Sequence, residues 1–120
     1  MTETCKFQKL KVYQLALNYV DVIYNLNAAL PDSEKFNLSS QIIRASTSIT
    51  LKIAEGSTGQ SDAEQSRFLG HAIRSFLETI SCLDLIERRK YIPKDEIASA
   101  RLKGHELFVK LLAFRRSLNS

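Results

Sequence analysis

Apolar residues recur every three or four positions through four segments of the chain, and helix-breaking residues separate these segments. Pro31, the pair Gly56 and Gly59, and Pro93 fall between them. The spacing predicts α-helices over residues 7–30, 38–55, 61–90 and 93–118. Short connections make consecutive helices antiparallel. The predicted fold class is therefore all-α, an antiparallel up-down-up-down four-helix bundle that forms a single domain over residues 1–120.

The apolar sectors of the first and third predicted helices are wide. In the first helix the polar residues cover only about a quarter of the circumference, and in the third the apolar residues cover about half of it. A lone surface helix needs a narrower apolar stripe than these two have. We therefore expect both helices to bury one face inside the bundle and another against a second subunit.

Local signals mark where three of the predicted helices begin or end. Ser61 and Glu64 have the spacing of a capping box at the start of the third helix. Gly56 stands where the residue after the C-terminus of the second helix is expected. Pro93 suits the first position of the fourth helix, because its fixed φ is already helical.

Charge and cysteine content limit the class of protein. The formal net charge is +4 and the pI is about 9.2, with the basic excess mainly in the second half, so contact with a polyanion is plausible. Cys5 and Cys82 lie far apart without metal-ligand spacing, and the first residues lack the apolar stretch of a signal peptide. No apolar run is long enough to span a bilayer. We expect a reduced, cytoplasmic protein that does not enter the membrane.

The residues that could carry catalysis do not form a known motif. His71 and His105 lie on different predicted helices, and neither His-x-x-x-His nor Glu-x-x-His occurs. The stretch from Gly56 to Ser61 lacks the lysine and the preceding strand of a phosphate-binding P-loop, so a helix–helix turn is expected there. The sequence predicts no catalytic residue, no metal site, no cofactor and no enzymatic activity.

Basic residues form the most informative polar pattern. On the third predicted helix, Arg67, Arg74 and Arg88 lie seven and fourteen residues apart and share one stripe with His71, opposite the phenylalanines. Arg88-Arg89-Lys90 closes the helix, and Tyr91 and Lys94 follow. In a ring of subunits this stripe would repeat and multiply phosphate contacts. The alternative is a solvated helix face, partly neutralised by Glu78 and Glu87.

A second polar set projects from one side of the second predicted helix. It consists of Arg44, Ser48 and Glu55. Because this face also packs against helices, a structural ion pair or hydrogen-bond network is favoured over a ligand site.

The central part of the sequence resembles a known family. The stretch from Gln41 to Ile49, followed by Lys52-Ile53-Ala54-Glu55-Gly56, is similar to the hallmark of the four-helix bundle family named for proteins encoded in 23S rRNA intervening sequences. The positions Pro31, Glu34, Leu38, Arg67-Phe68-Leu69, Ala72, Ser75 and Glu78 fit as well, and the match covers nearly the whole chain. One position departs from the family, which usually has Asn where this chain has Lys52.

The resemblance implies an antiparallel four-helix bundle that assembles as a homopentamer without known enzymatic activity. It also implies similarity to the accessory variability protein of diversity-generating retroelements, a basic pentamer that binds nucleic acid and a reverse transcriptase. The shared positions are expected to specify the bundle and its interfaces rather than chemistry; they are Arg44, Ser48, Glu55, Gly56, Ser75 and Glu78.

Two functional hypotheses follow. In the first, a non-enzymatic oligomer contacts RNA or DNA, with ribosomal RNA as one candidate, through Arg67, Arg74, Arg88, Arg89, Lys90, Lys94 and Arg101. Binding would neutralise phosphates without reading bases, because no aromatic stacking platform or groove-reading motif is visible. In the second, the protein is an interaction scaffold that presents helix faces to a partner protein, and the positive charge only aids encounter.

Overall fold

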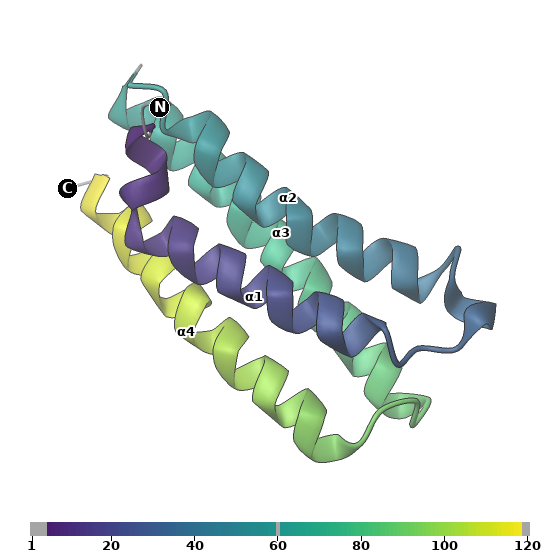
Figure 1. The fold of residues 1–120 in the computed structure, drawn as a ribbon. Helices are drawn as coiled ribbons and strands as arrows, with labels where there is room; N and C mark the ends of the chain where they lie inside the picture. Colours follow the sequence, from purple (N-terminus) through teal and green to yellow (C-terminus); the bar gives the residue numbers. More distant parts are fainter. Residues whose placement is uncertain (1–4, 60, 119–120) are drawn as a thin grey trace.

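Four α-helices dominate the computed structural model, which describes residues 5–59 and 61–118 (Figure 1). They are α1 (Lys11–Asn27), α2 (Leu38–Gly56), α3 (Asp62–Arg88) and α4 (Lys94–Leu118). Two short 3-10 helices, η1 (Lys6–Lys9) and η2 (Asp32–Glu34), precede α1 and α2. Each α-helix runs antiparallel to the one before it (Figure 1). The predicted all-α bundle is confirmed.

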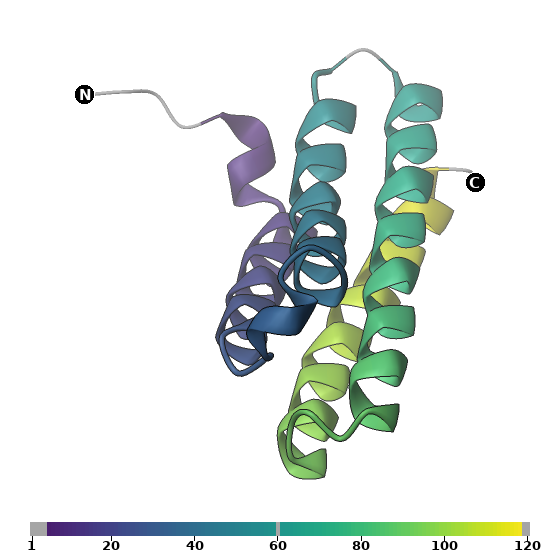
Figure 2. The same cartoon turned by 90° about the vertical axis from the view of Figure 1, so that its right-hand side faces the viewer.

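The helices enclose one apolar core. α1 and α3 each pack against both α2 and α4, and α2 and α3 lie side by side along much of their length (Figure 2). Every helix contributes an inward stripe at helical spacing. The largest fully buried apolar side chains are Tyr19, Ile23, Ile42, Ile49, Ile53, Leu69, Leu83, Ile86, Ile97, Leu107 and Leu111.

A buried polar contact crosses the middle of the bundle. The hydroxyl groups of Tyr19 on α1 and Thr79 on α3 lie 2.8 Å apart, and Thr79 donates to the carbonyl oxygen of Phe76 at 2.6 Å. Burial raises the pKa of Tyr19 to about 12, so its hydroxyl stays protonated. On α4, Gly104 leaves room for these rings, since a Cβ there would lie 2.9 Å from Cε1 of Phe76.

The first helix is shorter than predicted. Leu10 has extended backbone angles, and this break separates η1 from α1. The break is held by an edge-to-face contact between Phe7 and Tyr13 and by a hydrogen bond from the Gln14 side chain to the Gln8 carbonyl. At the other end, α1 stops three residues before Leu30, because a residue that precedes proline avoids the helical conformation.

Other helix ends also differ from the prediction. Gly56 is the last residue of α2 and not the residue after it. Its role is close packing, because a Cβ there would lie 2.5 Å from Cβ of Phe68 on α3. Pro93 precedes α4, and its carbonyl accepts the N–H groups of Glu96 and Ile97. At the start of α3, the hydroxyl of Ser61 accepts the Glu64 N–H at 3.0 Å, as expected for a cap.

The connections define two ends of the bundle. The α1–α2 connection (residues 28–37) and the α3–α4 connection (residues 89–93) meet at one end, which we call the two-turn end (Figure 1). There the Tyr91 hydroxyl donates to the carboxylate of Glu34 at 2.7 Å. η1, the α2–α3 turn and the last turns of α4 lie at the opposite end.

Several apolar side chains of α1 and α3 stay exposed in the single chain. Leu17 and Tyr24 on α1 retain 37% and 52% of their accessible surface, and Leu77 and Leu85 on α3 retain 50% and 41%. Leu17, Tyr24 and Leu77 belong to the wide apolar sectors predicted for these helices, whereas Leu85 lies outside the sector of α3. Among the described residues, no helix combines the length and apolar character that crossing a lipid bilayer requires.

Candidate nucleic-acid interface

The C-terminus of α3 ends in an unusual backbone conformation. Lys90 has a φ of 58°, in the left-handed region that glycine normally occupies. Its N–H binds the Glu87 carbonyl at 3.0 Å, and the N–H of Tyr91 binds the Ile86 carbonyl at 3.5 Å. These two bonds form a Schellman motif. The motif ends α3 two residues earlier than predicted.

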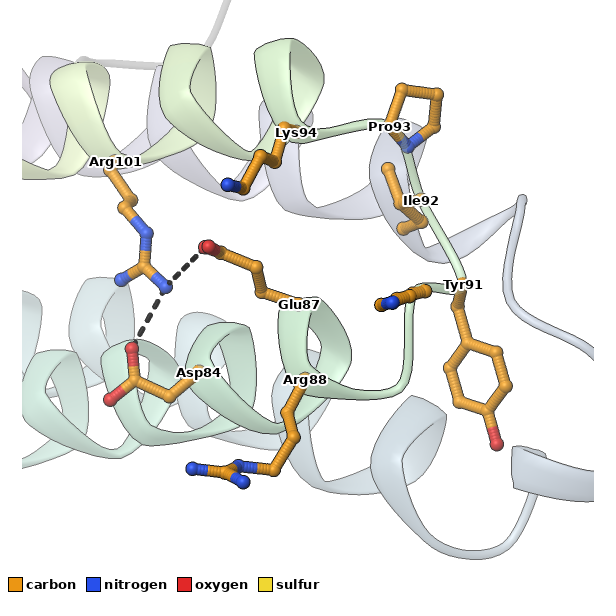
Figure 3. A pocket seen from close by; sticks show the side chains of 9 residues that line it. Asp84, Glu87, Arg88, Tyr91, Ile92, Pro93, Lys94 and Arg101 are labelled. Atoms are coloured by element: carbon orange, nitrogen blue, oxygen red, sulfur yellow. Dashed lines mark hydrogen bonds and ion pairs between the residues drawn. The ribbon is translucent and has the colours of Figure 1, made fainter.

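An open pocket of about 980 Å³ lies beside this turn (Figure 3). The run Tyr91, Ile92 and Pro93 forms part of its lining. Four basic residues from α3, α4 and their connection surround it together with two carboxylates; the basic residues are Arg88, Lys90, Lys94 and Arg101, and the carboxylates are Asp84 and Glu87. The structure thus brings together four of the seven residues predicted to bind nucleic acid.

Arg101 differs from the other three cations. Its Nη2 donates to Asp84 at 2.8 Å and to Glu87 at 3.1 Å, and this bridge joins α3 to α4 (Figure 3). Partial burial lowers the pKa of Arg101, but the two hydrogen bonds outweigh burial, so the pKa is raised. Arg101 therefore joins the two helices, and its predicted contact with nucleic acid stays a prediction.

The remaining rim of the pocket is cationic. Arg88, Lys90 and Lys94 are all exposed, and no described carboxylate lies within ion-pair distance of them. In Figure 3, Lys94 extends toward the Arg101 bridge and Arg88 points away along α3. Because the lining has four basic and two acidic side chains, the pocket keeps a net positive charge, and these three cations form no ion pair of their own. We call Arg88, Lys90 and Lys94 the cationic rim.

Arg67 and Arg74 lie away from this pocket. At a rise of about 1.5 Å per residue, Arg67 and Arg88 are roughly 30 Å apart along α3. Arg67 pairs with Glu64, and its guanidinium lies 4.6 Å from the ring centroid of Phe68. The prediction that the arginine stripe of α3 lies opposite the phenylalanines is therefore wrong for Arg67, which lies beside Phe68. Arg74 is exposed.

Arg89 belongs to the other side of α3, where it lines a second open pocket with Asn37 and Glu78. Close by, the hydrogen bond from Tyr91 is the largest cause of the lowered pKa of Glu34, and the Asn37 amide, the Leu38 N–H and the charge of Arg89 add to it. The same hydrogen bond is the largest cause of the raised pKa of Tyr91. Arg89 therefore lies at the two-turn end, close to the Glu34–Tyr91 hydrogen bond.

The comparisons with known proteins agree with this architecture. The family model for 23S rRNA-intervening sequence proteins matches residues 8–113. The chain belongs to that family. A solved structure from the S23 ribosomal protein family of Bacteroides thetaiotaomicron, a protein of unknown function, is similar with a TM-score of 0.79 and 30% sequence identity. The similarity covers 87% of this chain and 97% of that chain. No curated protein matches the chain.

The hallmark positions of the 23S rRNA-intervening sequence family hold α2 against α3. The hydroxyl of Ser75 donates to that of Ser48 at 3.0 Å, and Gly56 lies directly beneath Phe68. Both contacts need small residues, because larger ones would separate the helices. Sequence spacing alone did not reveal either partner, since both contacts join different helices.

The charged hallmark positions do not form the predicted network. Arg44 and Glu55 are eleven residues apart, which is about 16 Å along a helix, and both are exposed. Glu55 pairs instead with Lys52 at 3.5 Å. Lys52, where the resemblance leads us to expect Asn, thus makes its polar contact within α2. Glu78 is exposed and lines the same pocket as Arg89.

Residues that could bind a metal are scattered over the described part of the chain. Among the described residues, no three His, Cys, Asp or Glu side chains come together. His71 packs edge-on against Phe68, and His105 is exposed on α4. Cys82 is buried and burial raises its pKa, which keeps the thiol protonated.

Proposed function

We propose that this protein is a non-enzymatic homo-oligomer that binds RNA or DNA through the cationic rim. One observation carries the proposal: three cations without an ion-pair partner, from two helices and their connection, line one open pocket, whose four basic and two acidic side chains leave a net positive charge. Phosphate groups are the ligand that such a rim suits, because each lysine or arginine that neutralises a phosphate releases a counterion.

The backbone of Lys90 supports the proposal. A left-handed conformation costs a residue with a Cβ about 1–2 kcal/mol relative to glycine. Glycine would therefore be the better choice for stability alone at this helix end. A lysine that occupies a strained position is therefore a candidate for a functional role of its ammonium group.

The mechanism that fits this rim is charge neutralisation along a nucleic-acid backbone. Phosphate contacts position a protein on nucleic acid but carry no direct sequence information. The family name makes ribosomal RNA one candidate ligand. The free thiols of Cys5 and Cys82 fit the reducing cytoplasm as the compartment of this binding.

We further propose that the working unit is a ring of identical subunits, with five as the number that the family resemblance implies. The exposed apolar residues Leu17, Tyr24, Leu77 and Leu85 support this, because burying them against another copy would be favourable. A ring would present one cationic rim per subunit and so multiply the contacts with a long polyanion.

An interaction scaffold is the competing function, and the same exposed apolar residues favour it. The two functions differ in how binding depends on salt. Phosphate neutralisation gives a steep loss of affinity with rising salt, whereas an apolar protein–protein contact does not.

The test removes the cationic rim and measures binding to RNA and DNA over a range of salt concentrations. We expect the triple variant Arg88→Ala, Lys90→Ala, Lys94→Ala to lower the slope of log affinity against log salt by about 2, since each single-strand contact contributes about 0.7. The matched control is a second triple variant that removes three exposed cations elsewhere on α4, namely Lys103→Ala, Lys110→Ala, Arg116→Ala.

Three results would contradict the proposal. The wild-type protein could bind neither RNA nor DNA at low salt, which would leave the scaffold function. The control triple could lose as much affinity as the rim triple, which would mean that net charge alone acts. Light scattering on the same samples could give the mass of a single chain, which would exclude the ring.

A further inference from the structure

The most exposed large apolar side chain in the described structure is an aromatic ring at the two-turn end. Phe36 retains 90% of its accessible surface, and it stands between η2 and α2. The ammonium group of Lys35 lies 5.5 Å from the centroid of its ring. A phenylalanine so fully in water contributes little to the fold of the single chain.

The residues on both sides of Phe36 are fixed. Glu34 is buried, and its carboxylate accepts hydrogen bonds from the Tyr91 hydroxyl at 2.7 Å and from the Asn37 amide at 3.0 Å. Leu38, two residues after Phe36, is buried in the core. The backbone that carries the ring is therefore anchored from both sides, so the ring is presented to solvent by a rigid support.

Two cations lie near this position, Lys35 beside the ring and Arg89 close to the following residue, Asn37. Arg89 lines an open pocket together with Asn37, the neighbour of Phe36. The Glu34–Tyr91 hydrogen bond joins this connection to the one that carries Lys90. An exposed aromatic ring therefore lies at the same end of the bundle as Lys35, Arg89 and the cationic rim.

An aromatic ring among cations is the arrangement by which proteins bind single-stranded nucleic acid. The cations neutralise the backbone while an unpaired base stacks on the ring, and every base has a face that can stack. Bases inside a duplex are already stacked on one another and do not offer a free face to a surface side chain.

We propose that Phe36 is a stacking platform for an unpaired base, and that the ligand of this end is single-stranded RNA or DNA. This inference rests on the proposed function and deepens it, because it names the class of nucleic acid and a contact residue outside the basic set. It departs from the expectation that the chain has no aromatic stacking platform. Stacking tolerates any base, so the absence of a base-reading motif is consistent with it.

The experiment uses the absence of tryptophan from the sequence. Phe36→Trp introduces a single tryptophan at the platform, whose emission can be excited apart from that of the tyrosines. Leu102→Trp introduces one at an exposed position on α4, where Leu102 retains 71% of its surface. The ligands are a single-stranded RNA of about twelve nucleotides, the corresponding duplex, and a strand of equal length that has the backbone but no bases.

We expect single-stranded RNA to quench the fluorescence of Phe36→Trp strongly and to leave that of Leu102→Trp nearly unchanged. The strand without bases should bind through its phosphates without quenching. Phe36→Ala should weaken binding of the single strand by about fivefold or more, in line with the loss of one stacked base, and should change duplex binding little.

Different outcomes separate this inference from the proposed function. If the rim triple weakens RNA binding but Phe36→Trp is not quenched, the platform is refuted while the nucleic-acid function stands. If no RNA binds to the wild-type protein, both fail. If the Phe36→Trp variant already emits like a buried indole without RNA, and Phe36→Ala lowers the oligomer mass, the ring is covered by a second copy of the chain and the inference is overturned.

Discussion

Replacing Gly56 by alanine tests how closely α2 and α3 pack. A Cβ added to Gly56 would lie 2.5 Å from Cβ and 3.3 Å from Cγ of Phe68, whereas carbon atoms in contact are usually about 3.5–4.0 Å apart. The obstructing Cβ is attached to the backbone of α3 and cannot rotate away. The α3 helix would have to move outward by about 1 Å to restore an ordinary contact.

The expected cost of Gly56→Ala follows from two opposing effects. Overpacking of this kind costs about 1–3 kcal/mol. Alanine regains up to about 1 kcal/mol of helix propensity over glycine, and less at the last residue of a helix. We expect a net loss of about 1–2 kcal/mol, which corresponds to a Tm lower by roughly 4–8 °C in a domain of this size.

Gly70→Ala is the matched control. The atoms that a Cβ at Gly70 would meet belong to the guanidinium of Arg115, with Cζ at 2.9 Å. That group is the end of a flexible side chain and can move aside, although its hydrogen bond to Ser66 would then be disturbed. We expect this variant to keep most of the gain in helix propensity, so its Tm should stay the same or rise by a few degrees.

The measurement is thermal unfolding followed by circular dichroism, with all proteins at one concentration because subunit association stabilises the folded state. Equal Tm values for the Gly56 and Gly70 variants would refute the reasoning. They would show that α3 adjusts to Gly56→Ala without cost, and that the glycine of the family motif does not act through close packing with Phe68.

Two further predictions concern the two-turn end. Lys90→Gly should raise stability by about 0.5–1 kcal/mol in denaturant unfolding, since it relieves a left-handed residue, and should also weaken RNA binding. The control Lys110→Gly, at an exposed position inside α4, should lower stability. A loss of stability in both variants would contradict the strain at Lys90. The pKa of Glu34 is lowered in the folded state, so its contribution to stability is present above the ordinary glutamate pKa of about 4.3 and is lost as the pH falls through the lowered value. Glu34→Gln should therefore be less stable than wild type at neutral pH, and the difference should shrink in acid; a constant difference in unfolding free energy across that pH range would argue against it.

Sequence spacing predicted the helices well because apolar periodicity and glycine or proline breakers act locally. The break at Leu10 was missed, since the apolar pattern continues through it and only contacts with residues further along the chain favour it. The cap at Ser61 was found because its partner lies three residues away.

The candidate interface was less predictable, because its geometry depends on the register between helices. Arg101 looked like a free cation, yet its carboxylate partners lie fourteen and seventeen residues earlier on α3. The Arg44–Glu55 pair could have been rejected from the sequence, since eleven residues of helix place its members about 16 Å apart. Phe36 could not be recognised as a contact residue from the sequence, because a single aromatic residue before a helix can equally well be buried in the core.

Because the bundle has an even number of helices, both ends of the described chain leave it at the end opposite Phe36 and the cationic rim (Figure 1). A tether or fusion partner attached at either terminus would therefore hold every molecule with the two-turn end facing outward. Immobilisation on a sensor surface would leave the candidate interface accessible, and a bulky fusion would not obstruct it.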